Sequence, residues 1–121
     1  MQRPKSVDIL DYVVGRRDDF IAFLEELTLA ESPSVVPAVQ DDVRNIIADR
    51  LAPLGFRTFP LAGKNHGGHL YARPEDRPEG GDLQLLLGHY DTVWPIGTLK
   101  NMPFSVDGNI VRGPGVYDMK G

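Results

Sequence analysis

The sequence predicts an α/β fold built in layers, and three observations lead to this prediction. In the first half of the chain, apolar residues recur every three or four positions, which is the spacing of a helix with one buried face. In the second half, short β-prone segments alternate with turns rich in glycine and proline. Residues 83–87 (Leu-Gln-Leu-Leu-Leu) form a nearly continuous apolar run, typical of a strand buried on both faces. Helices followed by strands of this kind predict helices packed on a sheet.

Three helices are expected in the first half. Apolar faces over residues 7–14 and 20–27 indicate two helices, with a break at Gly15. The third apolar face runs over residues 36–51 and follows a short polar loop. Ser34 is the expected N-cap of this third helix, and the proline and glycine after it are expected to end it.

The second half is expected to contain short strands. Alternating residues predict strands at 56–59 and 69–72, and the apolar run predicts a buried strand at 83–87. An Asp-Gly pair between β-prone residues predicts a hairpin at 104–111. The charged stretch 73–81 is interpreted as a solvated surface loop.

Composition excludes several classes of function. The 121 residues include no cysteine, which rules out disulfides, iron–sulfur clusters and thiolate zinc sites. A net charge of −4 argues against a nucleic-acid surface, which is normally basic. No stretch approaches the ~20 apolar residues of a membrane helix, and residues 1–5 lead into no apolar secretion core. We therefore expect a cytoplasmic protein with neither a nucleic-acid nor a membrane partner.

A histidine and an aspartate directly follow the predicted buried strand. In α/β proteins, groups just beyond the carboxyl end of a central strand face the usual ligand crevice. His89 offers an imidazole to a metal, and Asp91 lies two residues further on, so in an extended segment both side chains point the same way. The Asp91 carboxylate can then accept the other ring N–H of His89 and orient it as a ligand. On its own, an H-x-D pattern is more often a turn-capping aspartate beside an incidental histidine.

A second element lies at residues 113–121 (Gly-Pro-Gly-Val-Tyr-Asp-Met-Lys-Gly). Its glycines allow the backbone to approach a crowded centre closely. Asp118, which lies 29 residues after His89, offers hard oxygen ligands that can bridge two cations. Alone, this pattern is also compatible with a loop that carries an ordinary exposed aspartate.

Together the two elements resemble the metallopeptidase family that contains glutamate carboxypeptidase, acetylornithine deacetylase, succinyl-diaminopimelate desuccinylase and aminoacylase. That family is marked by H-x-D-T/V-V after an apolar strand, then by an aromatic–Pro pair, a Pro-Phe pair and G-x-G-x-x-D-M-K-G. In this chain the motifs stand at residues 89–93, 94–95, 103–104 and 113–121. The Gly-Pro-Gly sequence is closest to the glutamate carboxypeptidase branch, because Gly-Arg-Gly is commoner in the deacetylases.

The resemblance implies a site with two Zn²⁺ ions in the complete enzyme. It makes His89 a terminal ligand of one zinc, Asp118 the carboxylate that bridges both ions, and Asp91 the catalytic residue that supports His89. Both ligands must reach one zinc at ~2.0–2.2 Å, so we expect their donor atoms within about 3–4 Å of each other. The implied fold is the N-terminal part of a three-layer α/β/α catalytic domain of the zinc-exopeptidase type, spanning residues 1–121.

The family's remaining active-site groups follow the bridging aspartate: a Glu-Glu pair that includes the general base, a further acidic ligand and a late histidine. None is found in these 121 residues, and neither is the lid domain through which relatives dimerise. We therefore expect a truncated chain that is inactive alone and binds zinc poorly, from a parent that forms a homodimer through its lid.

The resemblance implies that the parent hydrolyses a peptide or N-acyl amide bond beside a free carboxylate, by metal-activated water, in a small peptide or N-acyl amino acid. The alternatives are an N-acyl-amino-acid deacylase of the same family and a non-catalytic fragment that keeps only the fold.

The other polar and aromatic residues have ordinary expected roles. His66 and His69 lie on a glycine-rich turn with no helix to align them, and are expected to be surface histidines. Trp94 is compatible with a pocket rim or with packing under the next loop. Lys120 is expected to be solvated, and the serines of the loop 31–34 to have loop or cap roles.

Overall fold

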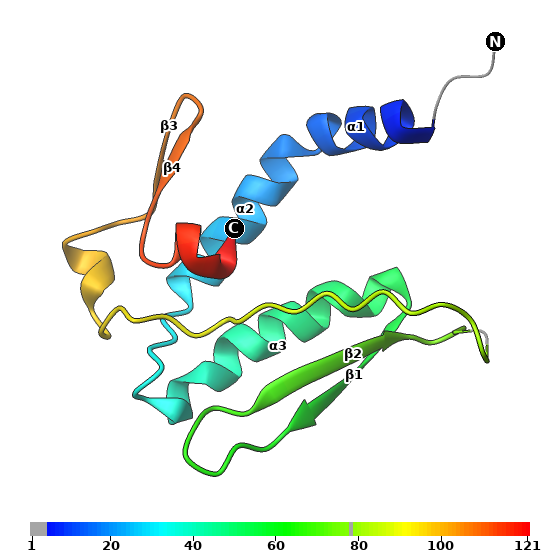
Figure 1. The fold of residues 1–121 in the computed structure, drawn as a ribbon. Helices are drawn as coiled ribbons and strands as arrows, with labels where there is room; N and C mark the ends of the chain where they lie inside the picture. The colour runs from blue at the N-terminus through cyan, green and yellow to red at the C-terminus, as the bar shows by residue number, and fades with distance from the viewer. Residues whose placement is uncertain (1–4, 78) are drawn as a thin grey trace.

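The computed structural model describes residues 5–77 and 79–121, which form helices and two small antiparallel sheets (Figure 1). The α-helices are α1 (Lys5–Gly15), α2 (Arg17–Leu29) and α3 (Gln40–Leu51). The strands are β1 (Phe56–Leu61), β2 (His69–Pro74), β3 (Ser105–Asp107) and β4 (Ile110–Arg112). Short helical turns are η1 (Pro37–Val39), η2 (Ala52–Leu54), η3 (Thr98–Lys100) and η4 (Val116–Lys120). A mixed α/β composition is confirmed, while the three-layer arrangement stays a prediction.

The first two helices form where the apolar spacing predicts them, with the break at Gly15. No residue of α1 is buried, and Figure 1 shows α1 projecting away from the rest of the chain. Helix α2 buries Leu27 and Thr28 near its C-terminal end. Within the described residues, no helix combines the length and the hydrophobicity needed to cross a membrane. Residues 1–4, on which part of the secretion argument depends, lie outside the described residues.

The third helix begins differently from the prediction. A 3₁₀ turn starts at Pro37, whose fixed φ suits a first helical turn, and the α-helix itself begins at Gln40. Val36 occupies the cap position and provides no side-chain hydrogen bond, so the prediction of Ser34 as the N-cap is wrong. Gly55 ends the helical region as predicted, because its φ of +78° lies in the left-handed region that favours glycine.

Helix α3 packs against the hairpin β1–β2, and the small core lies between these elements and α2. Val43 of α3 is completely buried, and Leu27 of α2 is almost so. Within the hairpin, Phe59 lies opposite Tyr71, with their ring centroids 5.9 Å apart. The second hairpin, β3–β4, turns at Gly108 (φ +57°), as the Asp-Gly pair predicts. Figure 1 shows this hairpin standing well apart from β1–β2.

The prediction of a buried strand at 83–87 is wrong. In the structure, residues 81–91 form no regular secondary structure, and the four leucines of the run are exposed, Leu86 at 96%. A strand requires hydrogen-bond partners along its edges. Each of the two sheets in the described residues contains only its own hairpin, so nothing pairs with this segment. The charged loop predicted at 73–81 begins later than expected, because Arg73 and Pro74 still pair with β1 as the end of β2. The described positions 75–77 and 79–81 are exposed, and residue 78 lies outside the described residues.

Candidate metal centre

His89 and Asp118 lie next to each other, although 29 residues separate them in the sequence. The His89 Nε2 atom is 3.0 Å from Asp118 Oδ1. On the opposite side of the ring, His89 Nδ1 is 3.0 Å from the main-chain oxygen of Asp91 and 3.3 Å from its Oδ1. Oxygen atoms therefore face both ring nitrogens. His89 and Asp118 approach each other at the expected distance, although the segment before His89 is not a strand, and their roles as ligands stay predictions.

The segment that carries the H-x-D pair is docked on residues 32–34. The backbone N–H of Thr92 donates to the Ser32 oxygen at 2.8 Å, and the N–H of Ser34 donates to the Thr92 oxygen at 2.9 Å. These two bonds form a short parallel bridge. The fully buried Ser32 hydroxyl adds a bond to the main-chain oxygen of Tyr90 at 2.7 Å. Together these bonds define where the backbone of the site runs.

Ser34 contributes to the site through its side chain. Its hydroxyl donates to Asp91 Oδ2 at 2.6 Å, on the carboxylate oxygen that does not face His89. The sequence argument gave this serine only a loop or cap role and missed the contact. No local signal could have revealed it, because 57 residues separate the two side chains.

Asp118 is placed by a glycine turn that contacts the H-x-D segment. Gly115 is buried and has a φ of +76°. A Cβ atom there would lie only 2.6 Å from Cγ2 of Thr92, so this close approach requires glycine. The N–H of Lys120 donates to the Gly115 oxygen at 2.9 Å and closes the turn around Asp118.

Lys120 fastens this turn to the end of α2. Its Nζ donates to the main-chain oxygens of Leu27 at 2.6 Å and Ala30 at 2.8 Å, both at the C-terminal end of the helix. Burial lowers the pKa of Lys120 to about 8, and the nearby Glu31 carboxylate opposes that shift. The expectation of a solvated lysine is therefore wrong, because the side chain reaches across to helix carbonyls that lack partners of their own.

The oxygens around His89 favour its protonated form. The hydrogen bond to the Asp91 main-chain oxygen raises the pKa of His89, partial desolvation opposes this, and the Asp118 carboxylate raises it further. A protonated ring donates from both nitrogens to these oxygens. A divalent cation held by His89 and Asp118 would need the Nε2 lone pair free of its proton, so protons and metal would compete for it.

The chemistry of these donors fits zinc, although their number is small. Imidazole nitrogen and carboxylate oxygen are both zinc ligands, and a carboxylate behind the second ring nitrogen is the usual support for a ligating histidine. Over residues 5–77 and 79–121, no group of three or more His, Asp or Glu side chains gathers in a way that could hold a metal ion. A catalytic zinc normally takes three protein ligands, so His89 and Asp118 form an incomplete set.

The other two histidines contact each other and their own turn, not His89 or Asp118. The rings of His66 and His69 are 5.0 Å apart, centroid to centroid. The His66 Nδ1 atom accepts the N–H of Gly68 at 3.0 Å, so this ring nitrogen is already engaged within its own turn. Trp94 is 38% exposed.

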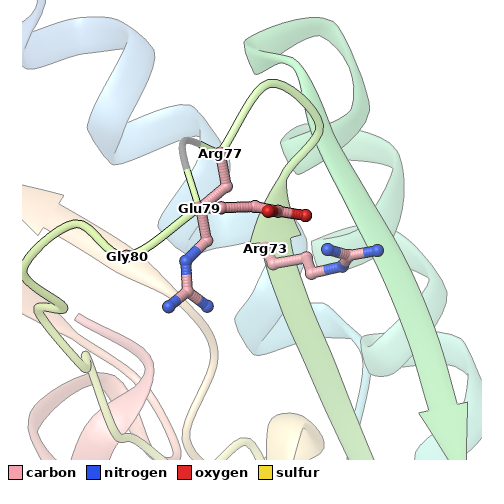
Figure 2. Close-up of a pocket in the computed structure, with 4 residues that line it drawn as sticks. All are labelled: Arg73, Arg77, Glu79 and Gly80. Atoms are coloured by element: carbon pink, nitrogen blue, oxygen red, sulfur yellow. The ribbon is translucent and has the colours of Figure 1, made fainter.

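A hollow on the surface is lined by Arg73, Arg77, Glu79 and Gly80. Figure 2 shows Arg73 on β2, and Arg77 and Glu79 on the loop that follows it. All four residues are exposed, and three of them lie in the loop after β2. Neither His89 nor Asp118 lines this hollow, so it is separate from the metal centre.

Comparison with known proteins gives one informative similarity. No family model matches the chain. Over 79 residues, or 64% of its length, the chain is 37% identical to Carboxypeptidase G2 of Pseudomonas sp. (strain RS-16). The aligned part is 19% of that protein, so the chain spans about a fifth of the length of the relative it matches. The similarity is thus to part of a peptidase.

Proposed function

We propose that this chain contributes part of the active site of a zinc-dependent metallopeptidase of the glutamate carboxypeptidase type. The observation that carries the proposal is the 3.0 Å approach of His89 Nε2 to Asp118 Oδ1, with Asp91 behind the other ring nitrogen. The partial similarity to Carboxypeptidase G2 supports a peptidase. The proposed reaction is hydrolysis of a peptide or N-acyl amide bond beside a free carboxylate.

Each of the three residues has a separate task in this proposal. His89 and Asp118 bind zinc through Nε2 and the carboxylate. The Nδ1–H of His89 donates to Asp91, whose main-chain oxygen lies at 3.0 Å and whose Oδ1 lies at 3.3 Å, and this leaves the Nε2 lone pair directed toward Asp118. When bound, zinc lowers the pKa of a water ligand and polarises the scissile carbonyl. The general base and the remaining ligands must come from further residues, because the described residues bring only two donors together.

Zinc titration of the chain tests the ligand assignment. We expect weak binding of Zn²⁺ that shifts the ring resonances of His89 in NMR spectra. His89→Ala and Asp118→Ala should abolish the binding, because each removes one of only two donors. His66→Ala is the matched control, since it removes a surface histidine whose Nδ1 is already hydrogen-bonded, and it should bind zinc as the unchanged chain does.

Two results would contradict the proposal. One is zinc binding that leaves the His89 resonances unmoved or survives in His89→Ala. The other is a loss of binding in His66→Ala comparable to that in Asp118→Ala. We also expect no turnover of an acyl-glutamate by this chain alone, because two protein ligands fall short of the usual three. Measurable hydrolysis would mean that the chain supplies catalytic groups beyond the three assigned.

A further inference from the structure

The geometry points to Ser34 as a positioning residue of the metal centre, which acts through the Asp91 carboxylate on the orientation of His89. This inference rests on the proposed function. It adds a residue to which the sequence argument gave only a loop or cap role.

The Asp91 carboxylate is held from two sides. Its Oδ1 lies 3.3 Å from His89 Nδ1, beside the Asp91 main-chain oxygen that is hydrogen-bonded to the same nitrogen at 3.0 Å. Its Oδ2 accepts the Ser34 hydroxyl at 2.6 Å. The same hydroxyl is 3.0 Å from the main-chain oxygen of Thr92. A hydroxyl has one proton, and the ionised carboxylate is both the nearer and the stronger acceptor. Ser34 therefore fixes the rotation of the carboxylate that presents Oδ1 to the histidine.

The order of these contacts differs from that of a serine nucleophile. In a catalytic triad, histidine lies between serine and aspartate and takes the serine proton. Here the aspartate lies between Ser34 and His89. The Ser34 hydroxyl therefore donates to the Asp91 carboxylate, and no histidine nitrogen lies next to it to take its proton. The remaining task that the geometry allows is orientation.

Ser34 is well placed for orientation because its own backbone is fixed. Its N–H donates to the Thr92 oxygen at 2.9 Å, next to the buried Pro33 and Ser32. Its side chain is exposed, so a somewhat larger residue fits there without crowding the core. Ser34→Thr keeps the hydroxyl, and Ser34→Val has nearly the same shape without it.

The test compares these two variants in the 121-residue chain. The first readout needs no metal: two-bond ¹H–¹⁵N correlation at a pH where His89 is neutral gives the fraction of rings protonated on Nδ1. We expect this fraction to be unchanged in Ser34→Thr and lower in Ser34→Val. The second readout is Zn²⁺ affinity, which should fall by about 3–10-fold in Ser34→Val. This is less than the ~10–100-fold loss expected on removing a group that contacts the ligating His89 directly.

Ser32→Ala is the matched control, because it breaks a bond to the same segment without touching the Asp91 carboxylate. It should lower thermal stability and leave the His89 tautomer unchanged. Ser34→Ala repeats the test with the smallest steric change, in case the valine variant does not fold.

Three outcomes separate the possible explanations. Identical tautomer fractions and zinc affinities in Ser34→Thr, Ser34→Val and Ser34→Ala would overturn the inference. An equal tautomer shift in Ser32→Ala would also overturn it, because docking of the segment would then explain the effect. If the unchanged chain binds no zinc at His89, the proposed function fails, while the metal-free tautomer comparison still decides the role of Ser34.

Discussion

Replacement of Gly115 by alanine should be one of the most destabilising single-methyl changes in this chain. Two costs combine at this position. A non-glycine residue in the left-handed region costs about 1–2 kcal/mol. The new Cβ would also lie 2.6 Å from Cγ2 of Thr92, which is buried and cannot move away freely. Overpacking of this kind costs about 1–3 kcal/mol, so we expect Gly115→Ala to lower the free energy of unfolding by about 2–5 kcal/mol.

Gly108 provides the matched control for this change. It has a φ of +57°, also left-handed, but a Cβ there would meet nothing within 4 Å. Gly108→Ala should therefore cost only the backbone term of about 1–2 kcal/mol. The difference between the two variants measures the steric overlap alone.

Thr92→Ser is the rescue variant, because it removes the Cγ2 atom and keeps the hydroxyl. The next atoms that a Cβ at position 115 would meet are 3.6 Å away, an ordinary contact distance. Urea unfolding followed by circular dichroism should show that Thr92→Ser costs less in the Gly115→Ala background than in the unchanged chain. The reasoning is refuted if Gly115→Ala costs no more than Gly108→Ala, or if the double variant shows no recovery.

Three further predictions concern single side chains. Lys120→Met should lower the free energy of unfolding by about 1–3 kcal/mol, because two helix carbonyls lose their donor. Calorimetry should show almost no change for Lys64→Met, which replaces an exposed lysine and is the control. An equal effect of both substitutions would contradict the contact of Lys120 with the helix. Leu86→Ser should change the free energy of unfolding by less than about 0.5 kcal/mol, because the side chain is 96% exposed. Light scattering should show less self-association, because an exposed apolar side chain is removed. A large loss of stability would show that the leucine is buried in solution. Asp91→Ala should weaken zinc binding by ~10–100-fold in a calorimetric titration while the chain stays folded, and unchanged affinity would end its assignment as the partner of His89.

The sequence by itself determined the elements that depend on local interactions. Helical spacing located α1, α2 and most of α3, because each helix forms its backbone bonds within its own segment. The Asp-Gly pair located the β3–β4 turn, because the turn conformation depends on the residue that adopts positive φ. The motifs also indicated His89 and Asp118 as a pair, although the distance between their side chains could be read only from the structure.

The tertiary structure alone decided the contacts between distant segments. Ser34 reaches Asp91 across 57 residues and Lys120 reaches Leu27 across 93, and nothing in the neighbouring sequence of either residue indicates a partner. The run at 83–87 is the opposite case, in which a local pattern predicted an element that needs a distant partner. Its composition predicts a buried strand, but a strand exists only where a second segment satisfies its backbone groups, and within the described residues none does. Local sequence specifies the bonds a segment makes with itself, whereas the bonds it makes with other segments depend on which of them the fold brings alongside.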